Sequence, residues 1–239
     1  MVLLFAPMQG YTEAAYRRWH FEHYDGVKEY YTPFARVEHG RLREKEKRDL
    51  LPDRNRGVPT VPQVIVSNRD ELAILCDSIQ RMGWQRIDIN MGCPFPMQTN
   101  AGRGSGILPH PDRIAQILEE VHSRPEVTFS VKMRLGLDDR MQCFELLPML
   151  NDSDIKQITL HPRLGIQQYA RQVDMEAFGL FYESCSKPLV YNGDIRTVAD
   201  IKRIQKNFPQ LSAVMIGRGL IDNPALAAEW SKTTSACVR

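Results

Sequence analysis

Six polar or reactive side chains stand at the ends of short apolar runs in the sequence. A thiol or an imidazole can transfer a proton, and a lysine or arginine can stabilise negative charge that develops during a reaction. Taken singly, each has a structural explanation, because a strand-end lysine can reach solvent and a lone cysteine is usually a small buried apolar residue. Stability alone does not explain why six such side chains each stand at the end of an apolar run. They are Gln63, Asn90, Cys93, Lys132, Arg134 and His161.

Two glycine-containing segments follow later apolar runs and are typical of phosphate-binding loops. They are Asn192-Gly193-Asp194 and Gly217-Arg218-Gly219, and the Asp-Asn-Pro at residues 222–224 would cap and begin a helix behind the second. Glycine lets the backbone approach a ligand, while main-chain amides and an arginine donate to phosphate. The alternative is a pair of ordinary glycine turns, but their place after the seventh and eighth runs favours a phosphate site.

A phosphate at these loops would place the rest of a ligand across the neighbouring residues. Lys132 and Gln63 would meet a planar polar heterocycle, and His161 would lie between ring and phosphate. A lysine beside a ring that gains negative charge on reduction stabilises the reduced form. The residue types therefore favour flavin mononucleotide (FMN) over a metal. The sequence has no His/Cys/Asp cluster with zinc or iron spacing, no dinucleotide-binding fingerprint and no P-loop.

The elements that must position these groups alternate along the chain. Short apolar runs predict strands that are buried on both faces, as in parallel sheets. Helical periodicity predicts helices over residues 68–82, 111–124 and 198–208 between them. The predicted strands are Leu3–Pro7, Glu29–Phe34, Val61–Val66, Arg86–Met91, Thr128–Met133, Gln157–Leu160, Pro188–Tyr191 and Ala213–Ile216.

Eight strand–helix alternations without a linker or low-complexity break favour an α/β fold of the closed (β/α)8 type, a TIM barrel. A doubly wound open sheet is the alternative. Eight such units occupy nearly all of the 239 residues, so we expect a single barrel domain over residues 1–239. The reactive groups listed above would then meet at the carboxyl-terminal end of the barrel.

Composition excludes several classes of protein. The first residues resemble no signal peptide and no run approaches the roughly 20 apolar residues of a membrane span, so we expect no membrane partner. The odd number of cysteines, with no CxxC pair, predicts free thiols in a reducing cytoplasm. They are Cys76, Cys93, Cys143, Cys185 and Cys237.

Net charge does not by itself point to a nucleic acid, because the formal charge is only +2. The segment from Arg36 to Arg56, however, contains eight Arg or Lys residues and only five Asp or Glu residues. A solvated helix face with ion pairs such as Glu44/Arg48 explains this segment equally well from charge alone.

The ordered motifs APMQGYT, PQVIV, DINMGCPFP with GRGSGIL, VKMR, ITLHPR, YNGDI and MIGRGLIDNP resemble the tRNA-dihydrouridine synthase family over about residues 5–224. The resemblance implies an FMN-containing barrel that reduces uridines in tRNA to 5,6-dihydrouridine, with NADPH or NADH as electron donor. It also implies that the segment Arg36–Arg56 contacts tRNA phosphates. The helical C-terminal tRNA-binding domain usual in the family would be absent or truncated, because only 15 residues follow Pro224.

The resemblance assigns roles to individual residues. Cys93 would be the general acid that protonates C5 of the uracil while hydride reaches C6 from N5 of the reduced flavin. Asn90 would face the uracil, and Arg134 and Tyr169 would contact the uracil or nearby RNA. The cofactor would be held by Pro7, Met8, Gln63, Lys132 and His161 around the ring and ribityl chain, and by Asn192, Gly193, Asp194, Gly217 and Arg218 around the phosphate.

Two other functions remain open at this point. One is an FMN-dependent oxidoreductase acting on a free pyrimidine, similar to dihydroorotate or dihydropyrimidine dehydrogenases, which share the phosphate loops. The other is a protein that holds flavin or RNA without turnover. The oligomeric state, the uridine position and the choice between NADPH and NADH have no signature in the sequence.

Overall fold

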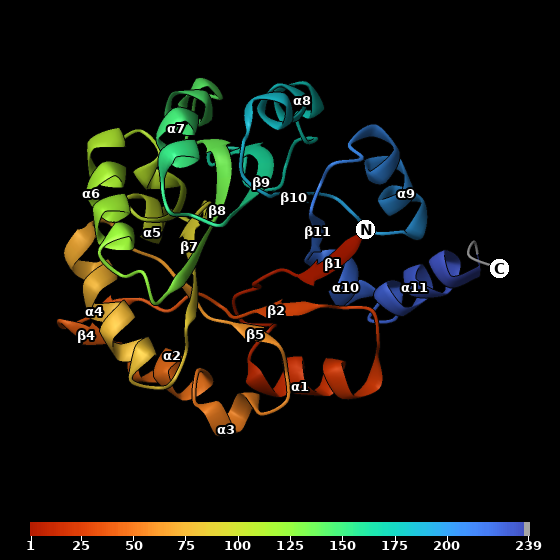
Figure 1. The fold of residues 1–239 in the computed structure, drawn as a ribbon, viewed down its shortest axis with the longest axis horizontal. Coiled ribbons are helices and arrows are strands. Elements are labelled where there is room, and N and C mark those ends of the chain that lie inside the picture. The colour runs from red at the N-terminus through yellow and green to blue at the C-terminus, as the bar shows by residue number, and fades with distance from the viewer. Residues whose placement is uncertain (237–239) are drawn as a thin grey trace.

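The computed structural model describes residues 1–236, in which nine parallel strands form one sheet (Figure 1). The order of the strands is β5-β2-β1-β11-β10-β9-β8-β7-β6. Their bounds are β1 Val2–Phe5, β2 Glu29–Tyr31, β5 Thr60–Val61, β6 Gln63–Val64, β7 Arg86–Met91, β8 Thr128–Gly136, β9 Gln157–Leu164, β10 Leu189–Asn192 and β11 Ala213–Ile216.

The strand interrupted at Pro62 closes this sheet into a barrel. Pro62 separates β5 from β6, and these two short strands lie at opposite ends of the strand order. Proline has no N–H to donate to a ladder, but its carbonyl still accepts from the main-chain N–H of Asp88 at 2.8 Å. The predicted strand Val61–Val66 is therefore one strand in two halves: β5 pairs with β2, and β6 pairs with β7. The (β/α)8 prediction is confirmed, and the open doubly wound alternative is wrong.

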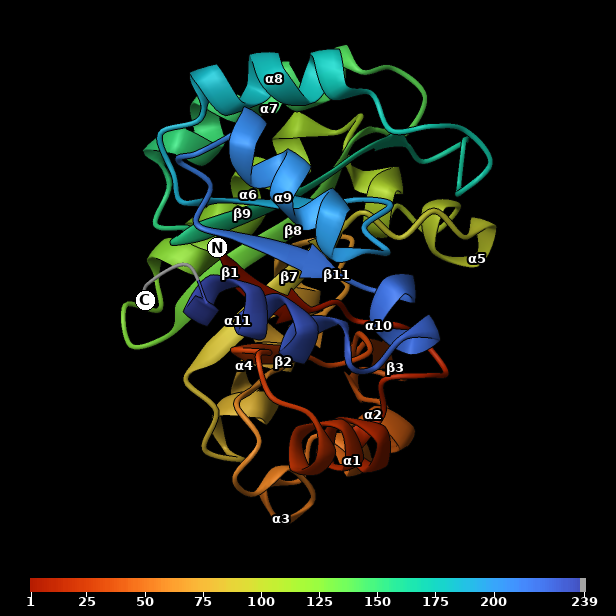
Figure 2. The ribbon, with the colours of Figure 1, turned by 90° about the vertical axis from the view of Figure 1, so that its right-hand side faces the viewer.

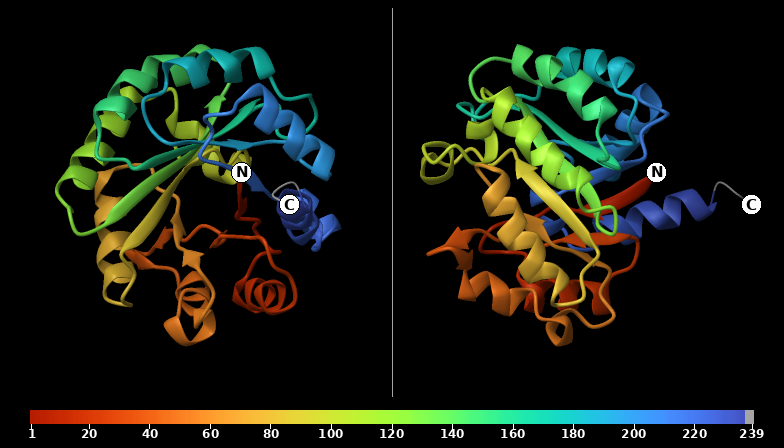
Figure 3. Two further views of the ribbon diagram at one scale, coloured as in Figure 1. Left: turned by 45° about the vertical axis from the view of Figure 1, so that its right-hand side comes forward. Right: turned by 60° about the vertical axis from the view of Figure 1, so that its left-hand side comes forward.

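Helices cover the outside of the barrel, as the views in Figure 3 show. Their periodic apolar faces pack on the strands: in α4, for example, Leu72, Leu75 and Ile79 are buried, and Asn68 caps the helix by accepting from the N–H of Glu71. The covering helices are α1 Ala14–His23, α4 Arg69–Gln80, α6 Pro111–His122, α7 Met141–Asp152, α8 Met175–Ser184, α9 Val198–Asn207 and α11 Leu226–Ala236.

Shorter elements lie in the loops that follow the strands. Figure 2 shows α5, α10 and β3 together at the end of the barrel toward which the arrow of β11 points. These elements are the hairpin β3 Val37–Glu38 and β4 Arg41–Leu42, the helices α2 Glu44–Asp49, α3 Pro52–Asn55, α5 Pro96–Thr99 and α10 Arg218–Asp222, and the 3-10 turn η1 Gly104–Ile107. They surround the rim where the candidate residues were expected.

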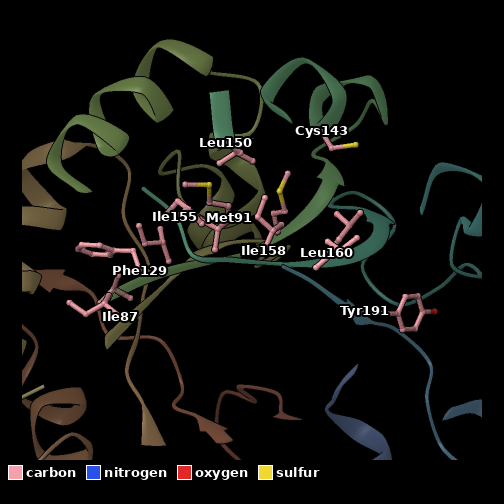
Figure 4. Packing of buried hydrophobic residues seen from close by; sticks show 14 of the residues in the cluster. Ile87, Met91, Phe129, Cys143, Leu150, Ile155, Ile158, Leu160 and Tyr191 are labelled. Carbon is pink, nitrogen blue, oxygen red and sulfur yellow. The ribbon is translucent and has the colours of Figure 1, made fainter. Parts of the chain in front are cut away.

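Along β7 and β8, polar and apolar side chains alternate, whereas the sequence predicted strands that are apolar on both faces. Figure 4 shows Ile87, Phe129 and Ile158 on the outer face of the sheet, where they join the core beneath the helices. The intervening positions, such as Asp88 and Ser130, face the barrel interior and are polar and buried. Both faces of the strands are buried, but only the outer face is apolar.

Two further sequence predictions can be compared with the structure. The cap predicted at residues 222–224 is displaced, because α10 already begins at Arg218, and Asn223 instead accepts from the N–H of Ala225 just before α11. Four cysteines are free thiols, whereas Cys237 lies outside the described residues. None of the described helices is long and apolar enough to span a bilayer. The single domain over residues 1–239 stays a prediction.

Candidate active site

A cavity opens at the carboxyl ends of strands β1, β8, β9, β10 and β11. The fold brings together residues that lie far apart in the sequence, because the ends of all these parallel strands meet at one rim. Ten of the predicted site residues line this cavity: Pro7, Met8, Lys132, His161, Tyr169, Asn192, Gly193, Asp194, Gly217 and Arg218. The other four, Gln63, Asn90, Cys93 and Arg134, do not line it and belong to a hydrogen-bonded network on the side of β7.

Lys132 is a cation without a protein counter-charge in direct contact. Within residues 1–236 its amine makes no hydrogen bond or ion pair, although Lys132 lines the cavity. Burial and the charge on Arg134 together lower the pKa of its amine to about 8, although the charge on Asp88 acts in the opposite direction. The amine is therefore available to an anionic or electron-rich ligand in the cavity.

His161 is held in one tautomer by a residue that the sequence analysis did not single out. A guanidinium nitrogen of Arg163 lies 3.0 Å from Nε2 of His161. Because a guanidinium can only donate, Nε2 must accept, and the ring proton resides on Nδ1. Burial holds the pKa of His161 well below its usual value, and nearby cations including Arg134 and Lys132 lower it further. His161 is thus a neutral donor at the cavity wall.

Asp194 orders the cationic side of the cavity. It adopts a left-handed backbone conformation (φ 44°) and forms ion pairs with Arg163 and with Arg218, the latter at 2.9 Å. The guanidinium of Arg218 also lies 4.7 Å from the ring centre of Tyr169. Asp194 and Tyr169 therefore fix the position of Arg218 at the loop where a phosphate was predicted.

Two of the three glycines that line the cavity, Gly193 and Gly217, lie in close contact with neighbouring side chains. A Cβ on Gly193 would lie 2.9 Å from a methyl carbon of Val173, and one on Gly217 would lie 3.0 Å from the sulfur of Met8. These glycines were predicted to let a ligand approach the backbone. In the structure, they let neighbouring loops pack closely at the cavity wall.

The amide of Asn90 holds the backbone before Cys93. Its oxygen accepts from the main-chain N–H groups of Gly92 at 3.0 Å and Cys93 at 2.8 Å, and its nitrogen donates to Gln63 at 2.8 Å. Gln63 in turn donates to Asp88 at 2.7 Å, and Ser130 donates to the other oxygen of Asp88 at 2.6 Å. Gln63 is fully buried in this chain of hydrogen bonds, so the structure places it beneath the site and not at the cavity surface.

Cys93 is fixed from its other side by the glycine-rich segment that follows it. Both the N–H and the hydroxyl of Ser105 donate to the carbonyl of Cys93, at 3.0 and 3.1 Å. Gly104 has a φ of 59°, and a Cβ there would lie 2.6 Å from the same carbonyl oxygen. The thiol packs in a small apolar cluster with Phe34 and Ile65. Burial raises its pKa, so the thiol stays protonated at neutral pH.

Arg134 connects the loops that follow β7 and β9. Its guanidinium donates to the carbonyls of Gly92 at 2.9 Å, Leu164 at 2.9 Å and Gln168 at 2.8 Å. The side chain is buried and absent from the cavity lining, so its visible function is to hold these loops together. Tyr169, which follows Gln168, is brought to the cavity edge by the same contacts.

Two residues of the site, Arg163 and Ser105, were not predicted from the sequence. Arg163 lies two residues after His161 in β9, and strand periodicity could have placed both side chains on one face. Ser105 belongs to the motif GRGSGIL, but its sequence position does not reveal that it contacts Cys93.

The segment Arg36–Arg56 folds into the hairpin β3–β4 and the helices α2 and α3. Many of its cations are paired nearby, as Arg43 is with Glu46 at 3.0 Å. Glu44 pairs with Lys47 at 3.8 Å, whereas the predicted partner Arg48 donates to the carbonyl of Glu44. The ion-paired helix face is thus present, and contact with RNA stays a prediction.

Comparison with known proteins decides the family. A sequence model of the dihydrouridine synthase (Dus) family matches residues 4–238. The chain belongs to the dihydrouridine synthase family.

Individual relatives of this dihydrouridine synthase family member are moderately similar. It is 30% identical over 227 residues to tRNA-dihydrouridine synthase B of Pasteurella multocida, covering 94% of this chain and 67% of that protein. It is 26% identical over 235 residues to tRNA-dihydrouridine(16) synthase of Neisseria meningitidis serogroup B, covering 95% of this chain and 70% of that protein. The chain thus spans about two thirds of the length of both relatives.

Solved structures support the fold alone. Morphinone reductase in complex with tetrahydroNAD superposes with a TM-score of 0.64 at 11% identity, covering 97% of this chain and 86% of that one. At such low identity, the similarity establishes a shared barrel and carries no information about substrate.

Proposed function

We propose that this protein reduces uridines in tRNA to 5,6-dihydrouridine, with FMN bound in the cavity and NADPH or NADH as electron donor. The observation that carries the proposal is the arrangement of a protonated, immobilised thiol, Cys93, at the same barrel rim as a cavity with an uncompensated cation, Lys132. Family membership supports the same reaction.

The residues of the cavity fit FMN. Lys132 offers a positive charge without a counter-charge, and His161 offers an N–H at Nδ1, both suited to the polar edge of a planar heterocycle. Arg218 offers a guanidinium near the glycine loops for a phosphate. The carboxylate of Asp194 would repel a phosphate. We therefore propose that Asp194 orients Arg163 and Arg218 and does not itself contact the phosphate.

When bound and reduced, FMN supplies the hydride that adds to C6 of the uracil ring. Lys132 stabilises negative charge on the flavin ring system. His161 is neutral because its pKa is lowered, and it can donate a hydrogen bond to the cofactor. The thiol of Cys93 donates its proton to C5, which completes the addition of two hydrogens across the double bond. A thiol is suited to this step because it is still protonated at neutral pH, where an ordinary carboxyl group is not.

The substrate must leave its place in the folded tRNA before the uracil can reach the cavity. Extrusion of a base costs a few kcal/mol, which contacts elsewhere on the RNA must offset. The segment Arg36–Arg56, at the same rim, is proposed to supply phosphate contacts. We also place the protein in the cytoplasm, where tRNA is modified and thiols stay reduced.

A paired measurement on Cys93→Ala tests this function. The purified wild-type protein should be yellow, bleach on addition of NADPH, and form dihydrouridine in unmodified tRNA as detected by mass spectrometry. The variant should bind flavin and bleach normally, but dihydrouridine formation should fall by about 10²–10⁴-fold, the usual contribution of a general acid. Cys185→Ala, which removes a thiol from the outside of the barrel, is the matched control.

Free uracil and orotate form the second arm of the experiment. We expect no dihydropyrimidine from either compound under conditions in which tRNA is modified. Product from the free base alone would contradict the proposal, as would equal yields of dihydrouridine from Cys93→Ala and the wild type. A protein that takes up no flavin would contradict the assignment of the cavity.

A further inference from the structure

The turn that follows Cys93 exposes two large apolar side chains. Phe95 is 50% exposed, and Met97 is 75% exposed, which is the largest value among the exposed large apolar side chains of the described residues. They flank the start of α5, which projects from the rim of the barrel in Figure 2. Apolar side chains that are exposed next to one another form a patch, and exposed apolar patches can mark binding surfaces.

This turn is held rigidly. The carbonyl of Phe95 accepts from the N–H groups of Gln98 at 2.8 Å and Thr99 at 3.0 Å, and the side chain of Gln98 is buried. Gly106 packs so tightly on the turn that a Cβ there would lie 2.4 Å from the carbonyl of Thr99. The two apolar side chains are therefore presented on a fixed support and cannot be covered by collapse of the loop.

The turn also lacks charge. Residues 94–102 (PFPMQTNAG) contain no Lys, Arg, His, Asp or Glu. A cation nevertheless lies beside it. Nη1 of Arg36 is 3.9 Å from the sulfur of Met97, and Nη2 forms a long ion pair of 3.7 Å with Glu38. Arg103, which follows the turn, is already ion-paired with Glu71. An apolar surface bordered by one arginine suits a nucleobase attached to a phosphate.

We propose that Phe95 and Met97 form a stacking surface for a nucleobase adjacent to the target uridine, with Arg36 contacting its phosphate. This inference rests on the proposed function. A base next to an extruded uridine loses a stacking neighbour, and an aromatic side chain can replace that neighbour regardless of base identity. Phe95 follows Cys93 by two residues, so the stacking surface lies beside the proposed general acid.

Steady-state kinetics with unmodified tRNA test the stacking surface. Phe95→Ala and Met97→Ala should raise the KM for tRNA, by about five- to one-hundred-fold for Phe95, the range found for loss of one base–aromatic stack. The rate of flavin bleaching by NADPH should not change. Phe95→Tyr should restore the wild-type KM because it keeps the aromatic face. Leu180→Ala, equally exposed on α8 on the outside of the barrel, is the matched control and should behave as wild type.

Salt dependence separates stacking from charge. The ratio of KM between Phe95→Ala and the wild type should be the same at low and high KCl, because no ion is released from an apolar contact. Arg36→Ala should instead reduce the slope of log KM against log salt by about 0.7–0.9, the contribution of one phosphate contact. Equal slopes for Arg36→Ala and the wild type would overturn the phosphate contact.

Three outcomes would distinguish this inference from the proposed function. If wild-type protein forms no dihydrouridine, the proposed function fails, and tRNA binding by fluorescence anisotropy then tests the surface separately. If tRNA is modified but neither KM nor binding changes in Phe95→Ala and Met97→Ala, the stacking surface is wrong. If a second copy of the chain covers the surface instead, sedimentation should show a wild-type dimer and a Phe95→Ala monomer with unchanged KM, which also overturns the inference.

Discussion

The interior of the barrel has two unlike halves. Strands β10, β11, β1, β2 and β5 contribute an apolar cluster that includes Val190, Met215, Leu4, Tyr31 and Val61. Strands β6 to β9 fill the other half with polar side chains in register. One layer consists of Gln63, Asp88, Ser130 and Gln157, and the next consists of Asn90, Lys132 and Thr159.

The difference follows from what each half must do. The apolar half gains stability from buried area, whereas every buried polar group in the other half costs about 1–3 kcal/mol if it is left unpaired. The polar half limits this cost by pairing its members in sequence, from Asn90 through Gln63 to Asp88. Two groups escape the pairing within the described residues: Lys132, and the hydroxyl of Thr159 beside it in register. Incomplete pairing of this kind is typical of a functional site.

The largest effect on reduction of the bound flavin should come from Lys132→Met in the polar half. The change keeps most of the side-chain volume but removes the uncompensated charge, so reduction of the bound flavin by NADPH should slow by about 10²–10³-fold. Stopped-flow absorbance measures the rate, and the flavin content of the purified variant reports binding separately. Lys132→Arg is the control that retains the charge. A normal bleaching rate in Lys132→Met would mean that the polar half does not stabilise the reduced ring.

Leu4→Ala tests the apolar half, where we expect a loss of stability without a loss of flavin reduction. Leu4 is buried in the inner cluster and does not line the cavity, so its truncation should lower the free energy of unfolding by about 3–4 kcal/mol. Urea denaturation measures this loss. Below the unfolding transition, the bleaching rate per bound flavin should equal that of the wild type. A rate loss comparable to that of Lys132→Met would erase the functional distinction between the two halves.

The strands were predictable from sequence because their apolar runs are short and well bounded. The bounds of β7 and β11 match the predicted Arg86–Met91 and Ala213–Ile216. The interruption at Pro62 was not anticipated, because the apolar run continues across it and only the pairing of its two halves with different neighbours reveals the break. The polar inner face of β7 and β8 was not anticipated either, because these runs were interpreted as apolar on both faces.

Which polar groups pair with one another could not be predicted. Gln63 was expected at the ring of the cofactor, but its amide is taken by Asn90 and Asp88 from a neighbouring strand. Arg163 was overlooked because its partner Asp194 is 31 residues away and meets it only when β9 and β10 are adjacent. Sequence periodicity shows which side chains face inward, whereas hydrogen-bond partners depend on register and rotamer.

The smallest effect predicted here concerns the pH dependence of stability in the polar half. Burial raises the pKa of Asp88 from 3.8 to about 6 in the folded chain, because desolvation outweighs the hydrogen bonds from Gln63 and Ser130. The folded state therefore holds this proton more tightly than the unfolded state. Its contribution to stability is complete below pH 3.8 and is lost as the pH rises to about 6, a change of ~3 kcal/mol at most.

Asp88→Asn removes this titration and should therefore remove its contribution to the pH dependence of the free energy of unfolding. The free energy of unfolding of the wild type minus that of Asp88→Asn, from urea denaturation at a series of pH values, should fall between about pH 4 and pH 6 and then stay level. Ser130→Ala should move the fall to higher pH, because the Ser130 hydroxyl stabilises the ionised carboxylate. Parallel pH profiles for wild type and Asp88→Asn would show that the interior around Asp88 is as well solvated as the surface. The polar half would then be a water-filled extension of the cavity, and the pairing from Asn90 to Asp88 would no longer explain how Cys93 is held.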